Sequence, residues 1–154
     1  MPNRGYIKEN DVEIKDIVLR SKLGSKFSLL GDPLFQELHI LETINNQIIT
    51  GEILIQDGSN FIGHFPIIGQ EYLDITFGTP LGVGENDFIT HTFYVYAVSP
   101  RARTKPESGG EVEKYALLFA SPELVENSHL KCHKSYNGTG TDIVNTIIKD
   151  NFPK

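Results

Sequence analysis

Several residue types that mark common protein classes are scarce in this chain. Its 154 residues include one cysteine, Cys132, and no tryptophan. A single cysteine cannot form an internal disulfide, so the sequence lacks the signature of a small secreted scaffold. No apolar run approaches the ~20 residues of a membrane helix, and the polar start MPNRGYIKENDVEIKD is unlike a signal peptide. We therefore expect a soluble protein, either cytosolic or assembled in the cytosol.

Basic residues are in the minority. Fourteen Lys and Arg stand against 20 Asp and Glu, which gives a net charge of −6. A protein that binds nucleic acid by neutralising phosphates needs a basic surface patch, so a nucleic-acid-binding protein is not favoured. A chain of this length has room for one domain and a short appendage, and such a domain buries about 70% of the surface that its unfolded chain exposes.

The polar residues show no pattern typical of a reaction centre. In a strand over His129–His133, Cys132 would point away from both histidines, so the three side chains could not converge on one ion. Glu107, Glu111 and Glu113 share a loop with cationic residues, whereas glycosidase carboxylates are held on separate rigid elements. No serine lies in a nucleophile elbow. We expect no enzyme activity, no cofactor and no metal.

Strand periodicity is the main signal that is present. The segment ITGEILIQDGSNFIGHFPIIGQEYLDITFGTP predicts two strands joined by a short apolar helical turn. The apolar face of the first strand consists of Ile49, Gly51, Ile53 and Ile55. Ser59 is expected to cap the helical turn from Asn60, which would cover an open barrel end. Gly51 and Gly69 are expected where a strand packs closely, bends or restarts.

Further strands are predicted on both sides of this segment. They cover Asp16 to Lys22, Lys26 to Leu30, Phe35 to Ile44, Phe88 to Val98 and Val112 to Ala120. The pattern of Phe35 to Ile44 fits both helix and strand templates. Both faces of Phe88 to Val98 are apolar, as in a central strand, and Val112 to Ala120 is its expected antiparallel partner. About seven strands predict an all-β antiparallel barrel or sandwich over residues 1–128.

The end of the chain changes character. Residues 129–154 are expected to form a connector strand and a C-terminal helix that Thr141 caps. The apolar stripe of this helix consists of Ile143, Val144, Ile147 and Ile148. The stripe must pack against the barrel, a partner or further chain. We expect a connection into a further domain, with packing against the chain's own barrel as the alternative.

Four segments, taken in order, carry a resemblance to a known family. They are Ile48 to Pro80, FYVYAVSPRA (Phe93 to Ala102), YALLFASPE (Tyr115 to Glu123) and KSYNGTGTDIV (Lys134 to Val144). Each consists mostly of β-pattern and turn residues. Together they resemble the first β-domain, which has a tail-tube-like fold, of the central hub protein of contractile bacteriophage tail baseplates. The resemblance also favours a strand over Phe35 to Ile44, as part of a hairpin into Ile48.

The resemblance implies a structural role in the virion. In that family, related β-domains pair edges into a ring, and three hub subunits mimic the sixfold symmetry of the tail tube. The ring lies between the tube and the trimeric spike. The expected partners are therefore further copies of the chain, as a trimer in the full-length hub, together with tube and spike proteins. DNA would pass through the lumen without specific binding, and assembly would take place in the host cytoplasm.

The segment RARTKPESGGE, residues 101–111, is the predicted contact with neighbouring subunits. Its mixed charges, proline and glycines cannot build a core, so we expect an exposed hairpin loop that orders on contact. The candidate interface residues are Arg101, Arg103, Lys105 and Glu107, with Ile143 and Ile147 from the terminal helix.

Two other function classes remain open. A stand-alone carbohydrate- or peptide-binding module could use a stacking platform formed by Tyr72, Tyr94, Tyr96 and Tyr115. The absence of tryptophan weakens the case for sugar binding. A hydrolase is disfavoured because no convergent polar set is visible.

Overall fold

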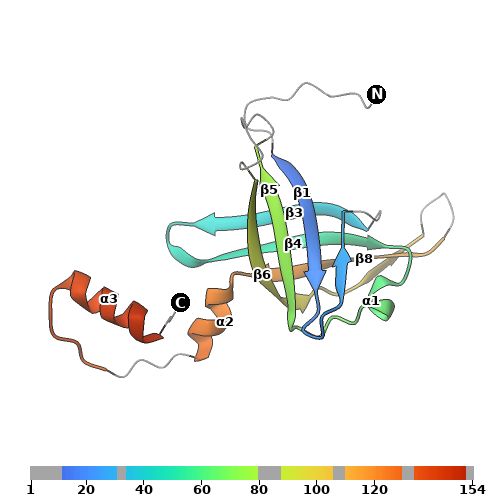
Figure 1. Ribbon diagram of the computed structural model, residues 1–154. Coiled ribbons are helices and arrows are strands. Elements are labelled where there is room, and N and C mark those ends of the chain that lie inside the picture. The colour runs from blue at the N-terminus through green and yellow to red at the C-terminus, as the bar shows by residue number, and fades with distance from the viewer. Residues whose placement is uncertain (1–11, 31–33, 80–87, 106–109, 130–133, 152–154) are drawn as a thin grey trace. The chain divides into compact units, whose positions relative to one another are not determined.

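The structure is a computed structural model that describes residues 12–30, 34–79, 88–105, 110–129 and 134–151 (Figure 1). Contacts within the chain divide it into two compact units, Met1–Pro122 and Glu123–Lys154. The described part of the first unit is an antiparallel sheet with one short helix. The predicted all-β class with short helices is confirmed.

Eight strands and a helical turn make up the described part of the first unit. The elements are β1 (Glu13–Arg20), β2 (Lys26–Ser28), β3 (Phe35–Thr43), β4 (Asn46–Asp57), α1 (Phe61–His64), β5 (Glu71–Gly78), β6 (Phe88–Val98), β7 (Ala102–Thr104) and β8 (Val112–Ala120). The segment with an ambiguous pattern is a strand, β3, as the resemblance favoured. The first strand begins at Glu13, three residues before the predicted start.

The strands form one sheet in the order β2-β1-β5-β6-β8-β4-β3, and β7 pairs with β8 beside this path. Figure 1 shows β1, β5 and β6 crossing steeply over β3, β4 and β8. One core lies between the two groups, because its buried residues come from both. They include Ile17, Leu19, Ile53, Ile55, Leu73, Ile75, Phe93, Val95, Leu117 and Phe119.

Strand β6 joins the two groups of strands. It pairs with β5 from Phe88 to Val95 and with β8 from Tyr94 to Val98. A register shift between Val95 and Ala97 bends the strand where the pairing changes. The predicted central position is confirmed, but apolar character on both faces does not mean burial on both, since Tyr96 is 49% exposed beside the shift.

Gly51 allows the neighbouring strands β3 and β8 to pack closely against β4. It is buried in β4, opposite Ile40 of β3 and Phe119 of β8. A Cβ atom at Gly51 would collide with the His39 carbonyl oxygen and the Phe119 ring. This confirms the expectation of close packing at Gly51. At Gly69, φ is +84°, a left-handed value that favours glycine where the chain turns into β5.

The helical turn α1 lies at one end of the sheet (Figure 1). Phe61 in α1 and Phe65 just after it are part of the core. The Phe61 ring centroid lies 4.6 Å from that of Phe27 and 5.6 Å from that of Phe65. The prediction that Ser59 caps this helix is wrong: the N-cap is Asn60, in the left-handed conformation and without a side-chain cap hydrogen bond. Ser59 instead donates its backbone N–H to Asp57.

The second unit contains two described helices, α2 (Pro122–His129), which begins at the boundary residue, and α3 (Gly140–Asn151). The predicted connector strand is covered only in part: His129 ends α2, and residues 134–139 contain no strand. Thr139, not Thr141, caps α3. Its hydroxyl accepts a 3.4 Å hydrogen bond from the Asp142 N–H and donates a 2.6 Å bond to the Asp142 carboxylate.

Candidate assembly interface

Three predicted interface residues of the first unit, Arg101, Arg103 and Lys105, lie in or beside β7, which pairs with β8 in a hairpin. Residues Ala102–Thr104 pair with Val112–Lys114, so Arg103 lies directly opposite Glu113. The interpretation of residues 101–111 as loop throughout is therefore wrong for β7, which carries Arg103. Glu107 lies outside the described residues.

Ion pairs connect the charged side chains across this hairpin. The Glu113 carboxylate accepts from Arg103 at 2.9 Å and from Arg101 at 3.5 Å. The Lys105 ammonium lies 2.9 Å from the Glu111 carboxylate. All three cationic side chains are at least half exposed. A partner could therefore reach each of them.

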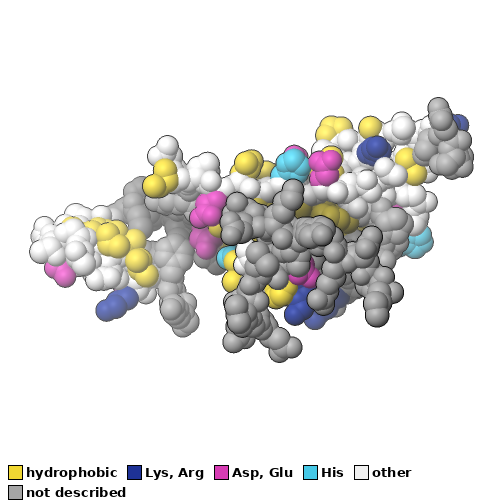
Figure 2. All heavy atoms as spheres, turned by 90° about the horizontal axis from the view of Figure 1, so that it is seen from above, with side chains coloured by type: hydrophobic (Ala, Val, Ile, Leu, Met, Phe, Trp, Pro, Cys, Tyr) yellow, Lys and Arg dark blue, Asp and Glu magenta, His cyan; other side chains and the backbone are white. Residues whose placement is uncertain are grey.

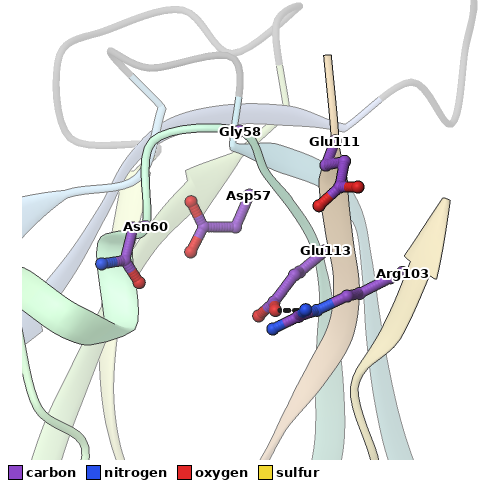
Figure 3. A pocket seen from close by; sticks show the side chains of 6 residues that line it. All are labelled: Asp57, Gly58, Asn60, Arg103, Glu111 and Glu113. Carbon is purple, nitrogen blue, oxygen red and sulfur yellow. Dashed lines mark hydrogen bonds and ion pairs between the residues drawn. The ribbon is translucent and has the colours of Figure 1, made fainter. Parts of the chain in front are cut away.

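A recess of about 260 Å³ opens beside the hairpin. Its lining residues are Asp57, Gly58, Asn60, Arg103, Glu111 and Glu113. Figure 3 shows the Arg103 side chain directed at Glu113, with Asp57 and Asn60 on the facing turn. Three carboxylates and one guanidinium could form an active site. Whether they do depends on the hydrogen bonds and ion pairs that each group already makes.

The Asp57 carboxylate makes hydrogen bonds that stabilise the fold. Its carboxylate accepts the Ser59 backbone N–H at 2.9 Å and the buried Tyr115 hydroxyl at 3.3 Å. Burial acts to raise the pKa of Asp57, but hydrogen bonds from the Phe61, Ser59 and Ile62 backbone and from Tyr115 outweigh it, so the pKa is lowered. Burial together with the Asp57 charge raises the pKa of Tyr115. The ionised Asp57 carboxylate and the neutral Tyr115 hydroxyl therefore form a stable hydrogen bond that fixes the turn, and they are poorly suited to proton transfer.

A second polar network covers the outer face of β1, β5 and β6. Arg20 forms a bidentate ion pair with Asp74, and the Thr92 hydroxyl donates to Asp74 at 2.7 Å. The hydrogen bond from Arg20, partly opposed by desolvation, lowers the pKa of Asp74. The Arg20 guanidinium also lies 5.1 Å from the Tyr72 ring centroid. The network is satisfied internally, so it stabilises strand pairing.

The four tyrosines considered as a stacking platform do not form one surface. Tyr72 and Tyr94 are neighbours, with ring centroids 4.7 Å apart and hydroxyls 3.3 Å apart. Tyr115 is buried on the other side of the sheet, at the core. The exposed Tyr96 lines a separate hollow with Ile68 and Val98. A platform of two rings is therefore the most that this part of the chain offers.

Among the described residues, no group of three His, Cys, Asp or Glu side chains is placed to hold a metal ion. His129 ends α2, whereas Cys132 and His133 lie outside the described residues. His91 packs between aromatic rings, 5.9 Å from Phe77 and 6.2 Å from Phe93.

The remaining predicted interface residues lie on α3. Ile143 and Ile147 are half-buried one turn apart, and Val144 and Ile148 beside them are more than half exposed. Figure 2 shows apolar side chains gathered on α3, at the left of the view. The predicted apolar stripe is present on the helix, and much of it faces solvent.

One apolar surface was not predicted. A groove of about 460 Å³ runs between β1 and β3. It is lined by Val12, Ile14, Leu38, Ile40, Glu42 and Phe77. Beyond it, Leu41 and Ile44 on the β3–β4 hairpin are strongly exposed. Periodicity could have found these apolar positions, but only the curvature of the sheet brings β1 and β3 to the two sides of one groove.

The comparisons with known proteins identify no relative. Protein-family models, curated proteins and solved structures were each compared with the chain, and none gave a match. Within the described residues, no helix has the length and apolar character needed to cross a membrane.

Proposed function

We propose that the chain is a structural component of the baseplate hub of a contractile phage tail. Copies of its β-domain form a ring between the tail tube and the spike. The order of the four resembling segments supports the family. The observation that carries the proposal is the architecture of the first unit, a curved antiparallel sheet whose two end strands, β2 and β3, each have one partner among the described strands.

Unpaired strand edges are what an assembling β-protein requires. Their N–H and C=O groups can extend a sheet into a neighbouring subunit. The hairpin of β7 and β8 adds exposed ion-pairing side chains, and α3 adds an apolar stripe. These features support contacts with several neighbours at once, as in a ring that also contacts tube and spike.

The proposed mechanism is assembly and symmetry matching, without a chemical reaction. Asp57, the most buried carboxylate of the recess, holds its turn, and Arg103 pairs with Glu113. An acidic protein of net charge −6 would repel DNA passing through a lumen rather than retain it. We propose that the full-length hub is a trimer, located in the virion baseplate and assembled in the host cytoplasm.

Association measurements test this proposal. Sedimentation velocity of the purified chain, alone and mixed with the tube and spike proteins encoded beside it, should show self-association or a complex. A chain that stays monomeric in every mixture would contradict the proposal. Neighbouring genes for tube, sheath and spike would support it independently.

A stand-alone binding module is the second candidate. The adjacent Tyr72 and Tyr94 rings, with Arg20 against Tyr72, are the observation that favours it. If it is correct, titration with oligosaccharides or peptides should shift the NMR signals of these tyrosines, and Tyr72→Ala should abolish the shift. The hub proposal expects no such saturable change.

A further inference from the structure

The two ends of the sheet carry opposite charge. The β3–β4 hairpin, Phe35–Asp57, contains no Lys or Arg and four carboxylates: Glu37, Glu42, Glu52 and Asp57. The β1–β2 hairpin, Glu13–Ser28, contains two carboxylates and four cationic residues: Lys15, Arg20, Lys22 and Lys26. Arg20 is used in its pair with Asp74. Exposed Lys22 and Lys26 form no ion pair within the described part of the chain, although the Lys26 charge also helps to lower the pKa of Asp74.

At both ends, one backbone edge also has no partner among the described strands. Among the described strands, β3 pairs only with β4, and β2 pairs only with β1. β3 has nine residues and contains neither Lys nor Pro, two residues with which proteins commonly block an edge. Leu41 in β3 is 63% exposed, and Ile44 just after it is fully exposed. The β3 edge is therefore long, acidic and partly apolar, whereas the β2 edge is short and basic.

Charge decides which edge of a second copy can meet β3. Two β3 edges placed together would bring carboxylates against carboxylates, and like charges directly opposite each other destabilise a strand pair. The Lys-bearing edge of β2 offers the opposite charge. We propose that the β3 edge of one copy, with Glu37 and Glu42, docks on the edge of the β1–β2 hairpin of a second copy, where Lys26 lies in β2 and Lys22 in the turn before it.

Such a contact is head-to-tail. It uses two different surfaces of the same chain, so it continues from copy to copy until a ring closes or a filament grows. The inference that this contact closes a ring rests on the proposed hub function. The choice of edges rests on charge and topology alone.

The test exchanges charges between the edges in the full chain. One variant carries Glu37→Lys and Glu42→Lys, and the other carries Lys22→Glu and Lys26→Glu. Each variant alone should associate at least about tenfold more weakly than the parent by sedimentation velocity, because both of its edges then have the same sign. An equimolar mixture should restore association, because each edge again meets an opposite charge.

The two double variants together separate edge pairing from net charge. They shift the net charge in opposite directions, so an effect of net charge alone would move association in opposite directions, whereas edge pairing predicts that both variants weaken it. The melting temperature of each variant confirms that it folds. Association of the parent should also weaken as salt is added.

The outcomes distinguish this inference from the proposed function. If the parent self-associates, or binds tube or spike protein, but the exchanges have no effect, the edge assignment is overturned and the hub proposal stands. If the parent forms a closed dimer, the edge assignment is likewise overturned and the hub proposal stands. A parent that remains monomeric in all mixtures overturns both.

Discussion

The two halves of β8 differ in what surrounds them. Residues 115–120 pair with β4, residues 117–120 also pair with β6, and Tyr115, Leu117 and Phe119 are buried. Residues 112–114 lie between β4 and the short edge strand β7, and Glu113 forms ion pairs at the surface. The backbone pairing is continuous along the strand, so the difference lies in the side chains and their environment.

This difference separates stability from recognition. The apolar half gains most of its free energy from burial and tolerates little change in volume. The charged half gains little from exposed ion pairs, so its sequence is free to serve a partner. Substitutions along β8 and its neighbours should therefore fall into two classes of effect.

The largest effect is expected opposite the buried half. Gly51→Val should lower the free energy of unfolding by at least about 3 kcal/mol, because the new side chain collides with the His39 carbonyl and the Phe119 ring. Gly58→Ala is the matched control: its Cβ would lie 3.6 Å from Val112 in the exposed half, an ordinary contact. Urea denaturation measures both. Equal stabilities of the two variants would remove the distinction between the halves.

The next effect is expected where the two halves meet. Asp57→Ala should cost about 2 to 3 kcal/mol, because the buried Tyr115 hydroxyl and the Ser59 N–H lose their acceptor. Tyr115→Phe removes only one hydrogen bond and should cost about 1 kcal/mol. Thermal denaturation of both variants checks this order, and a larger loss from Tyr115→Phe would show that packing dominates the site.

Acid should produce a smaller, graded loss. The pKa values of Asp57 and Asp74 are lowered in the folded protein, so their stabilisation is complete above the unfolded value, near 3.9. It is lost as the pH falls through the folded pKa values, because the unfolded chain then binds more protons. Denaturation curves between pH 6 and pH 2 should show this fall. Asp57→Asn should flatten it, and an unchanged slope would contradict the assignment.

The smallest effect is expected in the charged half. Glu113→Gln removes the partner of Arg101 and Arg103, which are exposed, and should change stability by no more than about 0.5 kcal/mol. Added salt should reduce even this difference. A loss comparable to that of Gly51→Val would mean that the β7–β8 hairpin belongs to the core of the fold.

The buried half of β8 is also the part that the sequence predicted best. Alternating apolar residues identified Tyr115, Leu117 and Phe119 as one face, and the same logic found β4 and β6. β7 was missed because three exposed residues leave no apolar alternation to detect.

The helix caps and the groove show a different limit of prediction from sequence. Thr139 and Thr141 both precede helical residues, and only backbone geometry decides that Thr139 is the cap. Ser59 was predicted as a cap, but its N–H bonds to Asp57 instead. The groove between β1 and β3 depends on how far the sheet curls, which local periodicity does not encode. Two of the predicted interface residues, Arg101 and Arg103, converge on Glu113, a partner that sequence spacing alone could not identify.

The antiparallel pairing of β4 with β8 has a consequence for synthesis. β4 ends at Asp57 and β8 begins at Val112, so residues 58–111 must be translated before the pairing can start. At the usual rate of elongation this takes roughly 3 to 11 s, whereas a hairpin such as β3–β4 forms in about 1 to 10 µs. During this time the nascent β3–β4 hairpin has no partner among the described strands on either edge. If two such hairpins meet edge to edge, their carboxylates disfavour pairing, because like charges opposite each other destabilise a strand pair.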